Sequence, residues 1–238
     1  KNIRDCLLTN VFGTNNILEL SIKYNISNFV LISTDKAVEP SNYMGLSKRI
    51  AEILVEFHSS KANVNMTSVR FGNVIGSSGS VLNHFTSLIK NKKDIIVTHP
   101  KVSRFFMSIK EACYLVLLSI KNSQNNHQVF MLDMGEEILI KDIAEKLIQL
   151  NGLEVDKDIK IIYSQLEKGE KLSEKLNYEF EQRFDTEVPK LITLDSSKKI
   201  EEDKIKDFMK DLSDLVYSKK ASNEKIAEFI NLAMKGLV

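Results

Sequence analysis

Residues 29–36 read Phe-Val-Leu-Ile-Ser-Thr-Asp-Lys, and this stretch decides the fold class. The first four residues form an uninterrupted apolar run of strand-forming residues, and the segments on either side carry apolar residues at helical spacing. A strand that is apolar throughout is covered on both faces, which is typical of parallel sheets. Ligands bind beyond the carboxyl ends of such strands, so we expect a site at Thr34, Asp35 and Lys36.

A helix is expected directly after this loop. Ser41 or Asn42 can cap its N-terminus, and apolar residues then recur at helical spacing for several turns. Met44 and Lys48 are four residues apart, about 400° of rotation, so they share one face of the helix. Tyr43 lies five residues from Lys48 and therefore projects from a different part of the helix surface.

The pair Met44 and Lys48 resembles the Tyr-x-x-x-Lys pair of the short-chain dehydrogenase/reductase superfamily, with methionine in the tyrosine position. Ser-Thr-Asp-Lys-Ala-Val at 33–38 and Met-Gly-Leu-Ser-Lys-Arg at 44–49 resemble the UDP-N-acetylglucosamine 4,6-dehydratases of bacterial surface-polysaccharide synthesis. The branch with this methionine is the most similar one. The resemblance continues, in the family's order, at residues 9–15, 69–81, 97–100, 104–107 and 169–172.

The resemblance implies an α/β fold: a partial Rossmann-like, doubly wound parallel sheet with a smaller α+β substrate-binding lobe. Residues 1–75 and 105–133 would form the C-terminal part of an NAD-binding domain. Residues 76–104 and 134–238 would form the sugar-nucleotide lobe and the C-terminal helices. We also expect a helix near residues 172–180.

A dehydratase of this kind moves hydride from C4 of the sugar to NAD, eliminates water across C5 and C6, and returns the hydride to C6. By resemblance, Asp35 would exchange the hydroxyl protons and Lys36 would take the C5 proton. Thr34 could relay a proton to Asp35, and Met44, which cannot exchange protons, would replace the usual tyrosine. Lys48 would bind the nicotinamide ribose and add positive charge near the ring.

Further residues would hold the cofactor and the substrate. Asn10 and Ser33 would join Lys48 at the cofactor. Small residues in the glycine-serine loop let backbone N–H groups approach phosphate oxygens at a helix start, and a guanidinium can bind two such oxygens at once. The substrate contacts implied by the resemblance are Asn73, Ser78, Gly79, Ser80, Val81, Thr98, Arg104 and Glu170.

One position departs from the family, which generally has Arg-Pro before Gly-Glu-Lys. This chain has Glu167 and Lys168 there, so an acid replaces a cation expected near the diphosphate, and Lys168 could replace it by a one-residue shift. Two other classes stay open: a 4-epimerase or reductase of the same superfamily, which needs no elimination, and a non-catalytic module that binds a sugar nucleotide.

Composition agrees with a soluble enzyme segment. The 238 residues are 43% hydrophobic, enough for a sizeable core, and the formal net charge of +1 gives no reason to expect nucleic acid. Cys6, Cys113 and the four histidines lack metal-ligand spacing, so no metal site is expected. The longest apolar run, near residues 114–118, is too short to span a bilayer, which favours a cytoplasmic location unless an upstream region anchors the protein.

No Gly-x-Gly-x-x-Gly loop follows a strand in this sequence, although such a loop normally holds the NAD pyrophosphate. We therefore expect the chain to be the C-terminal part of a longer protein and to be inactive alone. Family members commonly dimerise through the first helix and the catalytic helix. Because both helices carry apolar stripes here, we expect a homodimer or a larger homo-oligomer through them.

Overall fold

The computed structural model describes residues 2–61, 63–77, 79–123, 127–196, 201–218 and 220–237. A five-stranded sheet of order β1-β2-β7-β11-β10 forms its centre. The strands are β1 (Asn28–Ile32), β2 (Asn65–Arg70), β7 (His127–Leu132), β11 (Leu191–Ser196) and β10 (Glu181–Asp185). The first three run parallel, whereas β11 pairs antiparallel with both β7 and β10. The parallel core confirms the α/β class.

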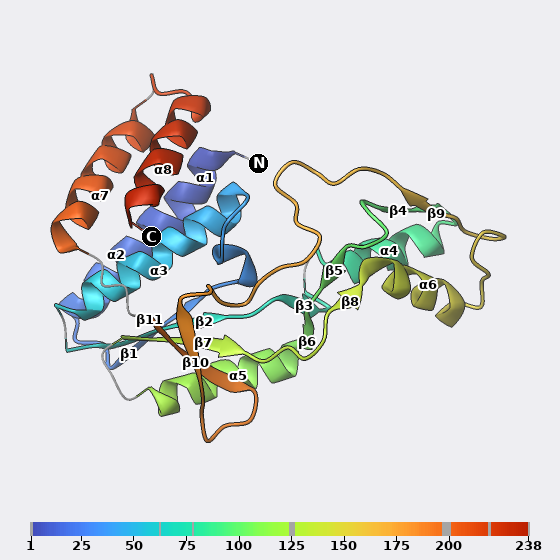
Figure 1. Cartoon of the computed structure of the whole chain (residues 1–238), viewed down its shortest axis with the longest axis horizontal. Helices are drawn as coiled ribbons and strands as arrows, with labels where there is room; N and C mark the ends of the chain where they lie inside the picture. The colour runs from blue at the N-terminus through green and yellow to red at the C-terminus, as the bar shows by residue number, and fades with distance from the viewer. Residues whose placement is uncertain are drawn as a thin grey trace.

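Helices cover both faces of this sheet (Figure 1). One face carries α3 (Tyr43–Ser59), which contacts β1, β2 and β7, with α1 (Ile3–Leu7) and α2 (Gly13–Lys23) beside it. A π-helical turn, Leu8–Phe12, joins α1 to α2. The other face carries α5 (Ile109–Asn122), which packs on β2 and β7. The sheet is therefore doubly wound, as the sequence predicted.

The smaller lobe lies to one side of the sheet (Figure 1). Phe85, Ile95, Ala144 and Ile148 are among the buried residues of its core. Its elements are α4 (Val81–Lys90), α6 (Ile140–Leu150) and the parallel pair of β4 (Ile95–Val97) and β9 (Ile161–Tyr163). Two further pairs lie between this lobe and the sheet: β3 (Asn73–Ile75) with β6 (Phe106–Ser108), and β5 (Ser103–Arg104) with β8 (Ile138–Leu139).

The last two helices, α7 (Glu202–Tyr217) and α8 (Asn223–Leu237), pack against α1 and α3 (Figure 1). Their apolar faces share one buried core with those helices, including Leu7, Leu54, Leu212 and Ile230. The Arg4 guanidinium donates to the carbonyl oxygens of Val216, Ser218 and Ala221, which satisfies the end of α7. Residues 181–196, α7 and α8, expected in the smaller lobe, pack on the larger one.

This packing covers part of the surface expected for self-association. The apolar stripes of α1 and α3 are buried, with Ile3, Ile50 and Ile53 each at most 2% exposed. Their cover is the chain's own pair of C-terminal helices rather than a second copy. Self-association through this face would require α7 and α8 to move away.

Residues 171–180 form turns and bends, not the helix predicted near 172–180. Their polar side chains bond to a loop far away in the sequence, so local helix propensity does not decide their conformation. The strand β10 that follows was not predicted either.

Within the described part of the chain, no helix has both the length and the apolar character needed to cross a bilayer.

Candidate active site

The loop after β1 places Asp35 and Lys36 in one turn of 3-10 helix, Asp35–Ala37. Asp35 is fully buried. Its Oδ1 accepts hydrogen bonds from the Thr34 hydroxyl at 2.8 Å, the Lys36 backbone N–H at 2.8 Å and Lys36 Nζ at 2.9 Å. Its Oδ2 has no hydrogen-bond partner among the described residues. One oxygen is thus held by three donors, and the other has unused acceptor capacity.

Lys36 joins this loop to the end of the neighbouring strand. Its side chain is 21% exposed, and Nζ also donates to Asn73 Oδ1 at 3.3 Å. Asn73 begins β3, just after β2 ends. Because parallel strands end at one edge of a sheet, the fold brings Thr34, Asp35 and Lys36 together with Asn73, which the resemblance had assigned to the substrate diphosphate.

The first turns of α3 carry the predicted Met44 and Lys48. Asn42 caps the helix by accepting the Gly45 N–H at 2.9 Å. Lys48 Nζ donates to the carbonyl oxygen of Ile32, the last residue of β1, at 3.1 Å. Burial lowers the pKa of Lys48, and the charge of Glu52 opposes that effect. An ammonium has three donors, so Lys48 keeps hydrogen-bonding capacity at the carboxyl end of β1.

A glycine allows α3 to approach the loop this closely. A Cβ added at Gly45 would overlap the carbonyl oxygen of Lys36. The helix backbone therefore lies directly on the turn that carries Asp35 and Lys36. Gly45 is therefore a structural requirement of the Met-Gly-Leu-Ser-Lys motif.

The two other predicted cofactor residues differ in their placement. Asn10 lies in the π-helical turn, where its Nδ2 donates to Ser47 Oγ at 2.9 Å, next to Lys48 in the sequence. Ser33 is only 4% exposed, and its hydroxyl donates to Glu52 at 2.5 Å. A cofactor contact of Asn10 stays a prediction, and the buried Ser33 hydroxyl is already bonded to Glu52.

A buried charge network beneath the loop was not predicted. Arg70, fully buried in β2, donates to both oxygens of Glu52 at 2.8 Å and to Glu181 at 2.7 Å. Burial raises the pKa of Glu52, but Arg70 and smaller contributions from Arg49 and Ser33 outweigh it and lower the pKa to about 2. The sequence contained a signal for this network, because an arginine inside a strand that is covered on both faces requires buried acids as partners.

The motif at residues 169–172 packs against the loop after β1, which carries Asp35 and Lys36. Ser41 Oγ donates to the carbonyl oxygen of Gly169 at 2.7 Å. Lys171 Nζ donates to the carbonyl oxygen of Val38 at 2.9 Å. Further along, the Tyr178 hydroxyl donates to the carbonyl oxygen of Ala37 at 3.0 Å. Residues 169–178 therefore fix the backbone of the loop that presents Asp35 and Lys36.

Three predicted substrate residues meet at one carboxylate. Arg104, 8% exposed, donates to Glu170 Oε1 at 3.3 Å, and Thr98 donates to the same oxygen at 3.0 Å. Arg104 also donates to the carbonyl oxygens of Ser103 at 2.6 Å and Leu172 at 3.2 Å. The guanidinium is thus already bound within the protein. Glu167, at the position that departs from the family, is exposed.

The glycine-serine loop ends where α4 begins. Ser80 caps α4, its Oγ accepting the Asn83 N–H at 3.4 Å, and Val81 is the first helical residue. Gly79 has a φ of +73°, and nothing lies within 4 Å of a Cβ added there. Ser78 falls outside the described residues. Backbone N–H groups at a helix start can bind an anion, and the phosphate site expected here stays a prediction.

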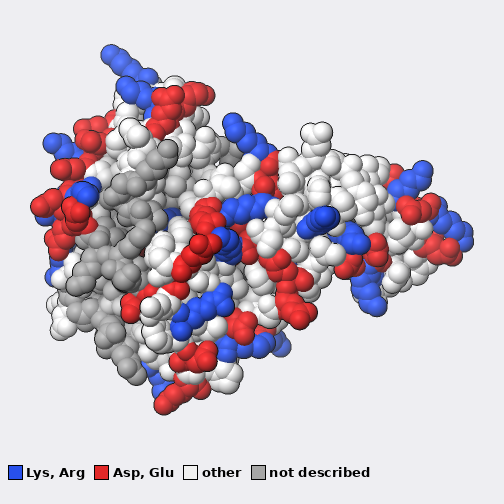
Figure 2. All heavy atoms as spheres, viewed as in Figure 1, with Lys and Arg blue, Asp and Glu red and all other residues white. Residues whose placement is uncertain are grey.

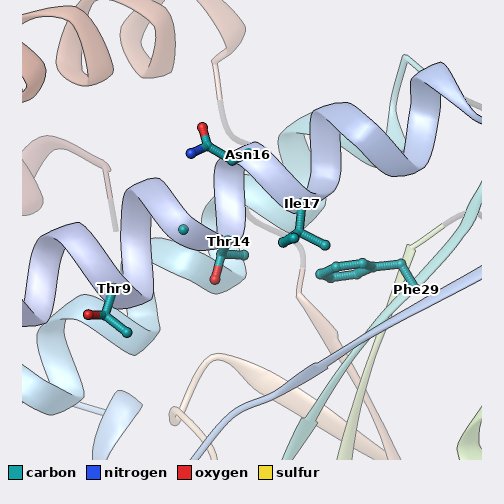
Figure 3. Close-up of a pocket in the computed structure, with 6 residues that line it drawn as sticks. Thr9, Thr14, Asn16, Ile17 and Phe29 are labelled. Atoms are coloured by element: carbon teal, nitrogen blue, oxygen red, sulfur yellow. The ribbon is translucent and has the colours of Figure 1, made fainter.

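Two of the surface hollows in the described part of the chain lie near the sheet and the candidate loop. One, of about 530 Å³, lies between α2 and β1, where Ile17 and Phe29 point toward each other (Figure 3). None of the predicted site residues lines it. The other, of about 330 Å³, is lined by Phe105 and residues near 174–183. It lies beside the candidate site, because Phe105 also approaches Gly72 and Asp35.

Charge and metal-ligand patterns are unremarkable elsewhere. Figure 2 shows basic and acidic side chains interspersed over the visible face rather than gathered by sign. No group of three or more His, Cys, Asp or Glu side chains that could hold a metal ion occurs in the described ranges.

Comparison with known proteins identifies the family. Residues 1–196 match the family described as polysaccharide biosynthesis protein. The capsular polysaccharide biosynthesis protein CapD of Staphylococcus aureus is 43% identical over 176 residues, which cover 74% of this chain and 29% of CapD. Pen from Bacillus thuringiensis has a TM-score of 0.72 at 31% identity, covering 96% of this chain and 68% of Pen.

More distant matches share the fold. DesIV of Streptomyces venezuelae, a dTDP-glucose 4,6-dehydratase with NAD bound, has a TM-score of 0.64 at 16% identity, over 71% of this chain and 57% of DesIV. Shorter matches, such as 38% identity over 123 residues, are to UDP-glucose 4-epimerases of Rickettsia species. The fold is Rossmann-like, the chain spans less than a third of CapD, and it belongs to the polysaccharide biosynthesis protein family.

Proposed function

We propose that the complete protein, meaning the full-length gene product, dehydrates UDP-N-acetylglucosamine or a similar UDP-N-acetylhexosamine to the 4-keto-6-deoxy sugar nucleotide. The observation that carries this proposal is the ion pair of buried Asp35 with half-buried Lys36 at the end of β1, beside a helix with Met44 in the tyrosine position. The similarity to CapD, named for capsular polysaccharide biosynthesis, supports a role in making a bacterial surface glycan.

The residues at the end of β1 fit an NAD cofactor. When bound, NAD would accept the hydride from C4 and return it to C6. Lys48 Nζ has donors left beside its bond to Ile32 and would bind the nicotinamide ribose. Asn10 donates through Nδ2 and keeps its amide oxygen as an acceptor. The NAD bound in DesIV supports the same cofactor here.

The way Asp35 and Lys36 are held supports the proposed proton steps. Asp35 would exchange the hydroxyl proton of the sugar through Oδ2, because Oδ1 is held by three donors. Thr34 donates to Oδ1 and is therefore placed to relay a proton. Lys36 would take the C5 proton from a position set by Asp35 and Asn73. Met44 would only line the site.

The diphosphate would bind at the N-terminus of α4, where Gly79 and Ser80 leave the helix N–H groups accessible. Arg104 would contact the diphosphate by exchanging its bond to Glu170 for one to a phosphate oxygen. Thr98 donates to the same Glu170 oxygen, so its hydrogen bond would also be affected when Arg104 moves to the phosphate.

The test is to incubate the complete protein with UDP-N-acetylglucosamine and record the mass of the sugar nucleotide. Loss of the mass of one water is the expected result. Binding without any change in the substrate would instead indicate a non-catalytic module and contradict the proposal.

A second candidate is a 4-epimerase, which the matches to UDP-glucose 4-epimerases favour. An epimerase would change the stereochemistry at C4 without changing the mass. Met44 argues against it, because a thioether cannot take the hydroxyl proton that the usual tyrosine accepts.

A further inference from the structure

The loop after β1, which holds the proposed proton-exchanging groups, is hydrogen-bonded at both of its ends. At its start, the Ser33 hydroxyl donates to Glu52 Oε1 of α3 at 2.5 Å. At its end, the carbonyl oxygen of Ala37 accepts the Tyr178 hydroxyl at 3.0 Å. Ser33 and Tyr178 are 4% and 6% exposed, so little water reaches either bond. The two side-chain bonds leave the reacting groups between two fixed points.

A single guanidinium connects these two bonds. Arg70, which is fully buried in β2, donates from Nε and Nη2 to the two oxygens of Glu52, each at 2.8 Å. Its Nη1 donates to Glu181 Oε2 at 2.7 Å, and the same oxygen accepts the backbone N–H of Tyr178 at 2.8 Å. The hydrogen bonds thus form one continuous chain, the loop brace, which consists of Ser33, Glu52, Arg70, Glu181, Tyr178 and Ala37.

The strand that carries Arg70 also holds the loop through its backbone. The N–H of Ser33 donates to the carbonyl oxygen of Val69 at 2.8 Å, and the N–H of Asp35 donates to that of Phe71 at 3.1 Å. Val69 and Phe71 are the residues on either side of Arg70. The ion pairs of Arg70 and the backbone bonds of its neighbours therefore fix the same segment.

The charges of the loop brace are balanced inside the protein. Arg49 adds a second guanidinium, which donates to Glu52 Oε2 at 3.0 Å and whose Cζ lies 5.1 Å from the centre of the Tyr178 ring. Two cations thus face two carboxylates, and none of the four side chains is more than 11% exposed. A buried ion network is often no more stabilising than apolar residues of the same volume. Stability is therefore a weak reason for this network, and a fixed geometry is a better one.

We propose that the loop brace positions Asp35 and Lys36 for the proton steps, with Arg70 and Tyr178 as its positioning residues. This inference rests on the proposed function. Proton exchange requires that the two side chains stay within hydrogen-bond distance of the reacting atoms, and a displacement of about 1 Å can cost a large part of the rate. The loop brace should therefore contribute to turnover and not to binding of the diphosphate.

The first experiment compares Tyr178→Phe with wild type in the complete protein. This change removes only the hydroxyl that bonds Ala37 and keeps the ring beside Arg49 and Arg70. The kcat should fall by about tenfold, while KM for UDP-N-acetylglucosamine should stay within about twofold, because the proposed diphosphate contacts lie elsewhere. Tyr114→Phe is the matched control at a tyrosine of α5 that is 64% exposed, and it should change neither constant.

The second experiment tests whether the two ends of the loop are held as one unit. Ser33→Ala removes the other side-chain bond and leaves Glu52 bonded to Arg70. At saturating NAD, the double variant with Tyr178→Phe should be no more than about twofold slower than the slower single variant, because residues that act as a unit are lost together. Losses that multiply would show two independent bonds and overturn the role of Arg70 as their link. Arg70 itself is left intact, because loss of one partner from a buried ion pair strongly destabilises a protein.

The third experiment does not depend on catalysis. Hydrogen exchange of the backbone amides is followed by mass spectrometry in the complete protein without substrate. In Tyr178→Phe, residues 33–38 should exchange about threefold or more faster than in wild type, because one bond that holds this segment is gone. Strand β7, residues 127–132, is the internal reference. A hydroxyl that serves stability alone would speed exchange in both segments to the same degree.

The outcomes separate the two proposals. A wild-type protein that dehydrates no UDP-sugar, although residues 33–38 exchange selectively faster in Tyr178→Phe, overturns the proposed function and supports the loop brace. Normal dehydration by wild type with an unchanged kcat in Tyr178→Phe overturns the positioning role, even if this variant melts at a lower temperature. Failure of wild-type dehydration together with uniform exchange overturns both.

Discussion

Asp35 uses its two carboxylate oxygens differently, and this asymmetry is the most specific feature at the scale of single residues. Three donors hold Oδ1, whereas Oδ2 is buried without a partner among the described residues. A carboxylate held in this way keeps one fixed orientation, which favours proton exchange with a substrate hydroxyl at the other oxygen.

Asp35→Asn in the complete protein should lower turnover by about 100-fold or more, because the amide cannot exchange the proton. Binding of the UDP-sugar, measured by isothermal titration, should change little, since the diphosphate contacts lie elsewhere. Asp133→Asn is the control, an exposed aspartate that follows β7 in the same sheet. A near-normal rate in Asp35→Asn would remove this residue from the mechanism.

Met44→Leu should leave turnover within about threefold of wild type, because this swap conserves volume and apolar character. Steady-state rates on the UDP-sugar check this, with circular dichroism to verify folding. A folded but inactive variant would mean that the sulfur atom itself takes part.

At the scale of elements, the contact between α3 and the loop after β1 depends on one missing side chain. Gly45→Ala should destabilise the complete protein and reduce turnover, because the new Cβ would displace the backbone of Lys36. Gly13→Ala is the matched control at a helical glycine, where the nearest atom to an added Cβ is 3.5 Å away. Thermal unfolding and rate measurements should show a loss for the first variant and none for the second.

The packing of α7 on α1 and α3 makes a separate prediction. Leu212 is 0% exposed in the shared core, so Leu212→Ala should lower the free energy of unfolding by about 2–5 kcal/mol. Leu232, in α8, is 75% exposed, and Leu232→Ala should have little effect. Denaturant unfolding measures both. Equal, small losses would mean that the C-terminal helices are not part of the core in solution.

At the scale of the whole molecule, two buried groups make stability depend on pH. Burial lowers the pKa of His127 from 6.5 to about 4. Arg70 is the main reason that the pKa of Glu52 falls from 4.5 to about 2 despite burial. Both groups bind protons more readily in the unfolded chain, so stability falls as the pH falls. His127 loses its contribution between pH 6.5 and about 4, and Glu52 loses its own between 4.5 and about 2.

His127→Gln in the complete protein should flatten the upper part of this pH dependence. Wild type should lose about 2–3 kcal/mol of unfolding free energy through His127 as the pH falls across that range. Urea unfolding followed by circular dichroism at several pH values measures the loss. His84→Gln, at an exposed position, is the control. An unchanged slope in His127→Gln would show that this histidine does not titrate with folding.

Local sequence patterns predicted those features of the fold that depend on residues close together in the chain. The strand at 28–32, the helices α3 and α4 and the adjacency of Asp35 and Lys36 follow from local patterns of apolar, capping and turn residues. The contact of Asn73 with Lys36 was not predicted, although parallel strands that end at one edge of the sheet explain it.

The contacts between residues far apart in the chain are known only from the folded structure. Arg70 and Glu181 are 111 residues apart and Arg4 and Val216 are 212 apart, so no local pattern pairs them. The same holds for Lys171, which bonds the carbonyl oxygen of Val38 in the loop after β1, and for α7 and α8 on the face expected to bind a second copy. A charged residue in a strand predicted to be buried, or an apolar stripe on a predicted helix, indicates from the sequence that a partner is needed. The free energy of the whole packed chain decides which partner it is.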